Sequence, residues 1–308
     1  MNDQMYTPDE IATIFKISKH TVYELIKRGE LRAFKVGNKM RIEQAEVDRY
    51  KESMTAAPKQ EKTGSTPPNS TQMYTIKITG SHDFVIEHLL KMVQRELHSI
   101  SLQPSFIGSL EGLMTLYHGA SDVAAIHLLD PASQTYNIPF IKQLFVHEPI
   151  TVLRLGAREQ GFIVKNGNPK QIQSFEDLVR KDVSFINRQK GSGTRFIFDH
   201  YLSVHNIAPA SIIGYDNEEW THLSTASAVS RGAGDVAFGI RSAASQLNLD
   251  FIPVTNEQFD LVFRWTDENK NALEALISLI QAPDFAASTQ DMKGYDFSEL
   301  GKIIYQKQ

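Results

Sequence analysis

A polar, proline-containing segment at residues 53–73, SMTAAPKQEKTGSTPPNSTQM, divides this chain into two parts. It holds three prolines, five Ser and Thr residues between positions 63 and 71, and almost no apolar side chain. Such a segment cannot bury enough apolar surface to offset the entropy lost on ordering. We therefore predict a flexible linker between a small domain at 1–52 and a larger one at 74–308. A long loop inside one domain is the alternative.

The first 52 residues have the pattern of a small helical domain with two strands. Thr7 and Glu10 form a capping box that opens a helix through Phe15, and Ser18 can cap a second helix, KHTVYELIKR. One face of that second helix carries its apolar side chains, Val22, Leu25 and Ile26. LRAFKVGNKMRI predicts two short strands around a Gly-Asn turn, and EQAEVDRYKES predicts a closing helix. Two helices joined by a tight turn fit a helix-turn-helix.

The middle of this first part is strongly basic although the whole chain has a net charge of −4. Between positions 16 and 41 there are eight Lys and Arg residues against two Glu. A basic patch on an acidic protein indicates a local contact with a polyanion. The candidate DNA-contacting residues are Lys19, His20, Thr21 and Tyr23 in the major groove, and Lys27, Arg28, Lys35, Lys39 and Arg41 near phosphates. A small protein-interaction module is the alternative.

The run YTPDEIATIFKISKHTVYELIKRGELRAFKVGNKMRI resembles the winged helix of the excisionase and MerR-type DNA-binding families. The likeness covers almost all of residues 5–52 and rests on four features. They are the Thr-Pro-x-Glu opening, the Ser-x-x-Thr-Val turn, the G-E-L-x-A after the helix, and the V-G-x-x-x-R-I of the wing. The resemblance implies binding to double-stranded DNA. Because one winged helix is small for a specific site, we expect a symmetric homodimer on a two-fold operator.

After the linker the chain alternates strands and helices, which predicts an α/β fold with a parallel sheet. Predicted strands lie at 74–80, 104–109, 122–130, 183–187, 235–240 and 249–263, with a strand pair or hinge crossing at 150–165. Predicted helices lie at 81–97, 111–119, 175–182, 194–206, 222–232, 266–281 and 284–292. Such sheets bind ligands beyond the carboxyl ends of their strands.

Four predicted helix starts in this part carry small hydroxyl residues. The strongest is the Gly-Ser-Gly-Thr loop in SFINRQKGSGTRFIFDHYL, residues 184–202, where a strand ends and a helix begins. Free N–H groups at a helix start, close backbone approach at glycine and hydroxyl donors suit an anion. The predicted ligand-binding residues are Ser81, His82, Ser109, Arg188, Gly191, Ser192, Gly193, Thr194, Arg195 and Thr225. Ordinary helix capping is the alternative for each hydroxyl.

Residues 74–308 resemble cytoplasmic relatives of type II periplasmic solute-binding proteins, in particular the molybdate-binding-like domain appended to such winged helices. The likeness is carried by TGSHD at 79–83, GSLEGL at 108–113, NRQKGSGTR at 187–195 and GDVAFGI at 234–240. It implies a two-lobed periplasmic-binding-protein-like domain with a ligand between the lobes. We expect the first lobe at about 74–155 plus 251–308, and the second at about 156–250.

The expected ligand is a small dianion. The Gly-Ser-Gly-Thr loop with a preceding Arg is similar to that of phosphate binders of the same fold, but the aspartate with which those proteins read a ligand proton is not identified here. The predicted set also holds many donors and no assigned carboxylate. These features favour molybdate, tungstate or sulfate over phosphate, with a small carboxylate as the alternative.

Other function classes lack their signatures. The chain has no cysteine, and its ten histidines show no metal-ligand spacing, so neither a metal nor a cofactor is predicted. Catalytic residues are not predicted either: no Ser has a nearby His-Asp spacing, no carboxylates pair around the loop, and His82 is a lone base. A phosphate-handling enzyme, a transport receptor and a dimerisation body with a vestigial cleft are the alternatives.

The start of the sequence has acidic residues where a signal peptide is basic, and no stretch approaches the ~20 apolar residues of a membrane span. We therefore expect a cytoplasmic protein without membrane contact. Together the two parts predict a one-component bacterial transcriptional regulator, in which a small anion controls DNA binding.

Overall fold

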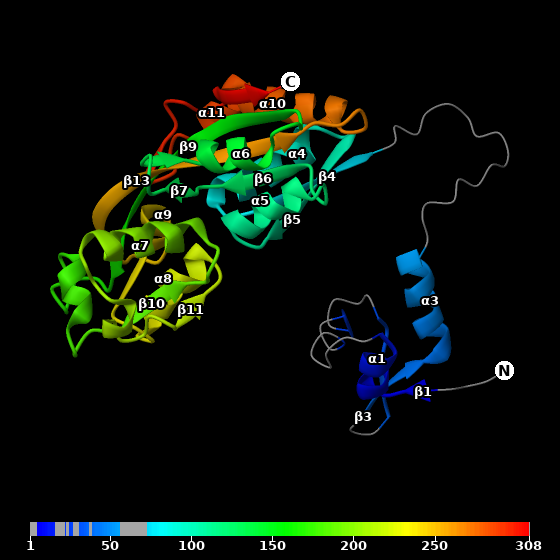
Figure 1. Cartoon of the computed structure of the whole chain (residues 1–308), viewed down its shortest axis with the longest axis horizontal. Coiled ribbons are helices and arrows are strands. Elements are labelled where there is room, and N and C mark those ends of the chain that lie inside the picture. Colours follow the sequence, from blue (N-terminus) through cyan, green and yellow to red (C-terminus); the bar gives the residue numbers. More distant parts are fainter. Residues whose placement is uncertain are drawn as a thin grey trace. The chain divides into compact units, whose positions relative to one another are not determined.

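The computed structural model describes residues 5–15, 22, 25–26, 31–36, 39–55 and 73–307. Contacts divide the chain into two units, Met1–Asn69 and Ser70–Gln308, and each is described here by itself (Figure 1). Within the described residues, no helix has both the length and the apolar character needed to cross a membrane.

The first unit is a small α/β domain. Its elements are β1 (Met5–Tyr6), α1 (Pro8–Phe15), β2 (Phe34–Val36), β3 (Lys39–Glu43) and α3 (Gln44–Thr55). The strands form an antiparallel sheet in the order β1-β3-β2. The predicted capping box is confirmed, because Thr7 N donates to Glu10 Oε2 at 2.7 Å and Glu10 N donates to Thr7 Oγ1 at 3.3 Å.

Apolar side chains from all parts of this unit form one core. Its buried members are Ile11, Val22, Leu25, Leu31, Ile42 and Val47, and the partly buried Ile26 packs against them. The prediction that the second helix turns Val22, Leu25 and Ile26 toward the core is therefore confirmed.

Most of the predicted DNA contacts lie outside the described residues. These are Lys19, His20, Thr21, Tyr23, Lys27 and Arg28, together with the cap at Ser18. Lys35 lies in β2 and Lys39 in β3, the two strands that were predicted around the Gly-Asn turn. Arg41, in β3, donates from Nη1 to the Met40 carbonyl at 2.9 Å.

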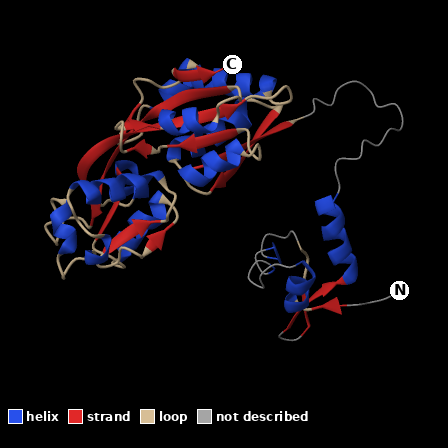
Figure 2. Ribbon diagram, in the orientation of Figure 1, coloured by secondary structure: helices blue, strands red, loops and turns tan. Residues whose placement is uncertain are grey.

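The second unit contains a long mixed sheet with helices packed against it, and a separate two-stranded sheet of β7 and β8 (Figure 2). Its strands are β4 (Tyr74–Gly80), β5 (Ile100–Phe106), β6 (Val123–Ile126), β7 (Leu129–Asp130), β8 (Thr135–Tyr136), β9 (Ile150–Val164), β10 (Phe185–Arg188), β11 (Glu218–Glu219), β12 (Val236–Ile240), β13 (Asp250–Arg264), β14 (Tyr295–Asp296) and β15 (Ile303–Lys307). Its α-helices are α4 (Phe84–Glu96), α5 (Ser109–Tyr117), α6 (Ile138–Leu144), α7 (Gly193–Val204), α8 (His222–Arg231), α9 (Arg241–Gln246), α10 (Lys270–Gln281) and α11 (Pro283–Thr289). Short 3-10 helices lie at Phe175–Val179 and Pro209–Ser211.

Two long antiparallel strands, β9 and β13, connect two lobes (Figure 1). At one end β13 pairs with β6, which continues to β4 and β5 and forms the first lobe. At the other end β9 pairs with β12, which continues to β10 and β11 and forms the second lobe. The chain thus leaves the first lobe along β9 and returns along β13, after which helix α10 packs against α4 and β4.

Each lobe has its own apolar core. In the first lobe Ile76, Ile78 and Val85 pack with Leu273 and Leu276 from α10. In the second lobe the aromatic side chains pack together, and these are Phe162, Phe175, Phe185, Phe198 and Phe238. The lobes are joined by the two crossing strands, by polar contacts, and by apolar contacts of Leu129 with the second lobe and of Phe196 with the first.

Several details differ from the sequence prediction. The sheet is parallel within each lobe but antiparallel at its centre, because the chain crosses between the lobes in opposite directions. Of the two alternatives for 150–165, a strand pair or a hinge crossing, the structure has the crossing, formed by the single strand β9. The helix predicted at 175–182 is a short 3-10 turn. The strand predicted at 122–130 is interrupted at His127 and Leu128.

The helix predicted from Ser81 begins later. Asp83 is its N-cap, with Oδ1 accepting a hydrogen bond from Val85 N at 2.8 Å. Ser81 instead continues the line of β4, since its N–H donates to the Ala125 carbonyl at 2.9 Å. The Ser81 side chain is consequently released from capping.

Candidate functional site

Three loops of the first lobe bring hydroxyl and imidazole groups together at the carboxyl ends of its strands. Ser81 follows β4, Ser109 begins α5, and His127 follows β6. The two serine oxygens lie 2.8 Å apart, and His127 Nε2 lies 3.0 Å from Ser81 Oγ. The backbone N–H of His127 also donates to Ser109 Oγ at 3.2 Å. All three side chains are buried.

The start of α7 in the second lobe lies directly against this group. An added Cβ at Gly193 would lie 2.3 Å from the His127 carbonyl oxygen, so only glycine permits this approach. Beside it, Leu110 N donates to the Gly191 carbonyl at 3.1 Å. The predicted residues of the two lobes therefore meet at one interface.

A buried chain of charged groups supports His127 from behind. His127 Nδ1 lies 2.6 Å from Glu257 Oε2, and the other Glu257 oxygen forms an ion pair with Arg158 Nη2. Arg158 Nη1 donates to Asp83 Oδ2 at 2.5 Å, and the Tyr295 hydroxyl donates to the same oxygen at 2.8 Å. The helix cap at Asp83 is thereby tied to the hinge strand that carries Arg158.

These contacts set the protonation states of His127 and Glu257. Burial opposes ionisation of Glu257, but Arg158 and His127 outweigh it and hold the pKa of Glu257 below its usual value. Burial, assisted by the positive charges of Arg158 and Arg188, lowers the pKa of His127. At neutral pH the group therefore contains a carboxylate and a neutral imidazole.

Arg188 is a buried cation that forms no ion pair with a carboxylate among the residues that the structure describes. Its Nη1 lies 2.8 Å from His222 Nδ1, Nη2 donates to the Trp220 carbonyl at 2.9 Å, and Nε donates to the Glu219 carbonyl at 3.3 Å. Burial and the nearby charge of Arg158 lower the pKa of Arg188 to about 9. The hydrogen-bond partners of Arg188 are all neutral. Its buried positive charge is therefore not balanced by an ion pair with any described residue.

His222 adds an unpartnered donor beside this cation. Arg188 can only donate, so His222 Nδ1 accepts and the ring proton sits on Nε2. Nε2 is buried and has no hydrogen-bond partner in the described structure. The rings of His222 and His127 have centroids 6.3 Å apart, which places the Arg188–His222 pair next to the Ser81–His127 pair.

The remaining residues of the Gly-Ser-Gly-Thr loop occupy the start of α7. Ser192 is its N-cap and its oxygen accepts from Arg195 N at 3.2 Å. Thr194 Oγ1 accepts from Gln160 Nε2 at 3.2 Å, which ties the loop to β9. Gly191 has a φ of +85°, the left-handed conformation that favours glycine.

Three other predicted ligand-binding residues are already engaged by protein partners. The charge of Arg195 is neutralised by Asp199 and Glu218, at 3.0 and 3.2 Å, and its guanidinium stacks on Tyr215. The Thr225 hydroxyl donates to the Thr221 carbonyl at 2.7 Å inside α8. His82 Nε2 contacts Glu87 at 2.7 Å, and its ring packs edge-on against Phe106.

Sequence reasoning missed several members of the group, namely Asp83, His127, Arg158, Gln160, His222 and Glu257. Two expectations were wrong. No carboxylate was assigned to the site, but Asp83 and Glu257 both lie in it. No serine was found with a His-acid pair, but Ser81, His127 and Glu257 form such a chain. A signal was present, because charged residues interrupt apolar strands at Arg158 and Glu257. Such interruptions mark buried polar contacts or function.

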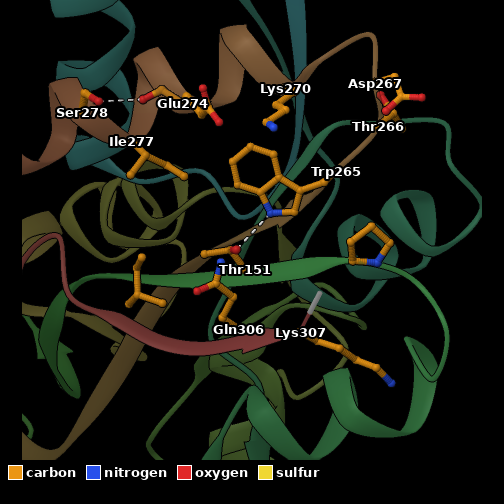
Figure 3. A pocket seen from close by; sticks show the side chains of 12 residues that line it. Thr151, Trp265, Thr266, Asp267, Lys270, Glu274, Ile277, Ser278, Gln306 and Lys307 are labelled. Atoms are coloured by element: carbon orange, nitrogen blue, oxygen red, sulfur yellow. Dashed lines mark hydrogen bonds between the residues drawn. The ribbon is translucent and has the colours of Figure 1, made fainter.

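A separate pocket of about 790 Å³ lies in the first lobe, where the ends of β9, β13 and β15 meet α10 (Figure 3). Trp265 lies at its centre and donates from Nε1 to Thr151 Oγ1 at 2.9 Å. Lys270 and Glu274 of α10 line it, but none of the predicted ligand-binding residues does. It is therefore distinct from the group between the lobes.

The fold and the site define a two-lobed binding domain, which follows a helix-turn-helix domain in the sequence. A family profile for the PBP superfamily domain matches residues 90–281, and one for a helix-turn-helix domain matches residues 5–55. The chain belongs to the PBP superfamily domain family. This combination fits a DNA-binding regulator with a ligand-binding domain.

One known protein is similar to this chain in sequence over its whole length, and others are similar to its second unit in fold. YvgK of Bacillus subtilis (strain 168) is 35% identical over 309 residues, which cover 97% of each chain. The tungstate ABC transporter structure from Geobacter sulfurreducens has a TM-score of 0.52 at 11% identity, covering 69% of this chain and 96% of that one. A substrate-binding protein of a putative phosphate ABC transporter from Clostridium perfringens, solved with bound phosphate, has a TM-score of 0.50 at 16% identity, covering 70% and 97%. At these identities the two structures show the fold alone.

Proposed function

We propose that this protein is a one-component transcriptional regulator whose second unit binds a small oxyanion between its lobes and thereby controls DNA binding. The observation that carries the proposal is the Arg188–His222 pair. Within the described part of the chain, it presents a buried cation without a carboxylate partner and a buried N–H without an acceptor. An anion would satisfy both groups, and a cation would be repelled.

The donors around this pair favour a tetrahedral anion. Ser81 and Ser109 come from the first lobe, whereas Ser192, Thr194 and the start of α7 come from the second. Among the described residues, the N–H groups of Gly193 and Thr194 have no protein acceptor, as is usual at a helix start. Donors that converge from several directions fit a tetrahedron better than a planar carboxylate.

Molybdate and tungstate are the preferred ligands, followed by sulfate, with a small carboxylate as the alternative. The same fold occurs in a tungstate transporter structure and in a phosphate-bound structure, which supports an oxyanion as the ligand class. For this chain the preference rests on the donor set and on the charge of Arg188, both of which suit a compact anion.

For the first unit we propose an excisionase or MerR-type winged helix that binds double-stranded DNA as part of a homodimer. The helix-turn-helix match and the antiparallel strands β2 and β3 support this proposal. Arg41 on β3 would contact phosphate, and the second helix would enter the major groove. Ligand binding between the lobes would then change the affinity of the dimer for its operator.

Calorimetric titration of the full chain with tungstate, molybdate, sulfate, phosphate and malonate tests the ligand class. We expect binding of at least one tetrahedral anion, and a loss of about tenfold or more in affinity for Arg188→Gln and for Ser192→Ala, since each removes a charge-assisted or charged donor. Arg241→Gln is the matched control, because Arg241 is already paired with Glu159. Binding of malonate alone would replace the preferred ligand by the carboxylate.

DNA control requires a second measurement. The operator is obtained by selection from a random DNA library, and its affinity is then measured with and without the bound anion. A change of at least fivefold in wild type, absent in Arg188→Gln, is expected for a coupling free energy of about 1–3 kcal/mol. Equal operator affinity in both conditions would refute control by the anion.

The Ser81–His127–Glu257 chain supports one second candidate, an acyl- or phosphoryl-transfer enzyme. In such enzymes a histidine oriented by an acid activates a serine. The Ser81 oxygen here also contacts Ser109, and it is buried at the interface between the lobes. Hydrolysis of p-nitrophenyl acetate or p-nitrophenyl phosphate that disappears in Ser81→Ala would favour this candidate over the sensor.

A further inference from the structure

The protons of the Ser81–His127–Glu257 chain can be assigned from its hydrogen bonds. Glu257 is held as a carboxylate by Arg158, so it accepts and His127 Nδ1 carries the ring proton. In a neutral imidazole the other nitrogen, Nε2, then accepts a hydrogen bond. Ser81 Oγ, 3.0 Å away, is its donor.

This assignment commits the single hydroxyl proton of Ser81. Since Ser81 donates to Nε2, Ser109 must donate to Ser81 across their 2.8 Å contact, while Ser109 accepts from the backbone N–H of His127. Ser109 can turn its proton toward a ligand by giving up one bond. Ser81 cannot do so without leaving Nε2 of a buried imidazole without a donor.

One proton added to His127 Nε2 removes the need for Ser81 to donate its hydroxyl proton to the imidazole. The imidazolium would donate to the Ser81 oxygen from Nε2 and to Glu257 from Nδ1, and the Ser81 hydroxyl would become free to donate to a ligand. The added charge also favours a dianion. Asp83 and Glu257 offset the charges of Arg158 and Arg188, so a proton on His127 raises the net charge of the group from zero to +1. A positive site attracts a dianion more strongly than a monoanion of the same shape.

We infer that the site binds a tetrahedral dianion together with one proton, which His127 takes up from solvent, and that this proton selects dianions over monoanions of the same shape. The inference rests on the proposed function. It assigns to His127 the role of a specificity-determining residue, which acts on the ligand through the Ser81 hydroxyl.

The groups around His127 are consistent with a proton that arrives only with an anion. Glu257 on β13 favours the imidazolium, whereas Arg158 on β9 and Arg188 on β10 oppose it. His222 on α8 faces it as a neutral ring, Ser81 and Ser109 contact it from the first lobe, and Gly193 of α7 packs against it. A dianion beside Arg188 would make the local charge negative and so favour protonation of His127.

Calorimetry with tungstate and perrhenate tests the inference, since both are tetrahedral and carry two charges and one charge, respectively. Titrations near pH 7 in two buffers of different ionisation enthalpy report the protons taken up. We expect uptake approaching one proton per tungstate and little per perrhenate. The affinity for tungstate should also fall by up to about tenfold per pH unit above pH 7, while that for perrhenate stays level.

His127→Gln provides the variant arm, because an amide can hydrogen-bond but does not titrate. It should abolish proton uptake with tungstate and bring the affinities for the two anions closer together. His88→Gln is the matched control, since His88 contacts Ser288 on the surface of the first lobe. If His127→Gln fails to fold, the wild-type buffer and pH series alone decides.

The outcomes separate the two proposals. Tungstate binding with equal heats in both buffers would overturn the proton-coupled inference and leave the oxyanion sensor standing. Unchanged proton uptake in a folded His127→Gln would also overturn it. Failure of every tetrahedral anion to bind would overturn both proposals.

Discussion

His127 and Glu257 are 130 residues apart in the sequence and meet at 2.6 Å between Nδ1 and Oε2. The contact joins the end of β6 in the first lobe to β13, one of the two strands that cross between the lobes. It therefore couples the geometry of the candidate ligand site to the hinge.

Replacing Glu257 with Gln should destabilise the second unit. The change removes one carboxylate of a fully buried ion pair and leaves Arg158 with Asp83 alone. Breaking a buried pair of this kind costs about 3–5 kcal/mol. Urea unfolding of the full chain, followed by tryptophan fluorescence, measures the loss. Glu299→Gln is the control, because Glu299 pairs with Arg154 at the surface, and an equal loss in both variants would contradict the assignment.

Gly193→Ala should prevent the lobes from approaching as closely as they do in the structure. The new methyl group would lie 2.3 Å from the His127 carbonyl, which is backbone and cannot rotate away. We expect the variant to lose anion affinity by about tenfold or more, while each lobe keeps its fold. Calorimetry and circular dichroism measure the two effects. Gly167→Ala is the control for backbone strain without a clash, since its φ is +79° but an added methyl group there meets no atom within 4 Å. A matching loss of affinity in it would refute the steric explanation.

The stability of the second unit should fall as the pH drops below about 6.5. Burial, together with the charges of Arg188 and Arg158, holds the pKa of His222 well below 6.5. The unfolded chain therefore binds a proton at a pH where the folded chain does not, which favours unfolding as the pH falls. The slope for one such histidine is up to about 1.4 kcal/mol per pH unit.

His222→Asn isolates this contribution, because Asn keeps an acceptor for Arg188 but does not titrate. Urea unfolding of wild type and variant between about pH 7.5 and 5.5 should give a steeper loss in wild type. Parallel pH profiles would mean that His222 titrates normally in the folded chain.

The sequence predicted local features of the fold well, because they depend on neighbouring residues. The capping box at Thr7 and Glu10 follows from residues three positions apart, and so does capping by Ser192, which was the alternative to ligand binding there. Helix starts and strand ends in the second unit were likewise located from changes in apolar periodicity.

The buried polar group could not be assembled in the same way. Arg158 contacts Asp83 across 75 positions and His127 contacts Glu257 across 130, and no local pattern pairs residues over such distances. The N-cap of α4 was also misplaced, because Ser81 and Asp83 are both good caps by residue type. Asp83 is the cap because Arg158 and Tyr295 fix its carboxylate at that place.

Arg41→Ala should weaken DNA binding to all sequences alike. If Arg41 contacts phosphate, its loss releases one counterion fewer and reduces the salt dependence of log K by about one unit. Binding to operator and to unrelated DNA, measured between about 50 and 200 mM salt, tests this. Arg49→Ala is the control, since Arg49 of α3 pairs with Glu46, and an unchanged salt slope for Arg41→Ala would exclude Arg41 from the phosphate contacts.

The pairing of β9 with β13 shifts register twice, between Pro253 and Thr255 and between Phe259 and Asp260. Glu257 lies between these two irregularities, directly opposite Arg158. A sheet bends most readily where its pairing is irregular, so the Arg158–Glu257 ion pair lies at the bending point of the crossing strands. A small rotation at a bending point displaces most the atoms that lie farthest from it. A change of one bond or one charge at this point would therefore be magnified into movement of the outer faces of both lobes, without a separate relay of residues to carry it.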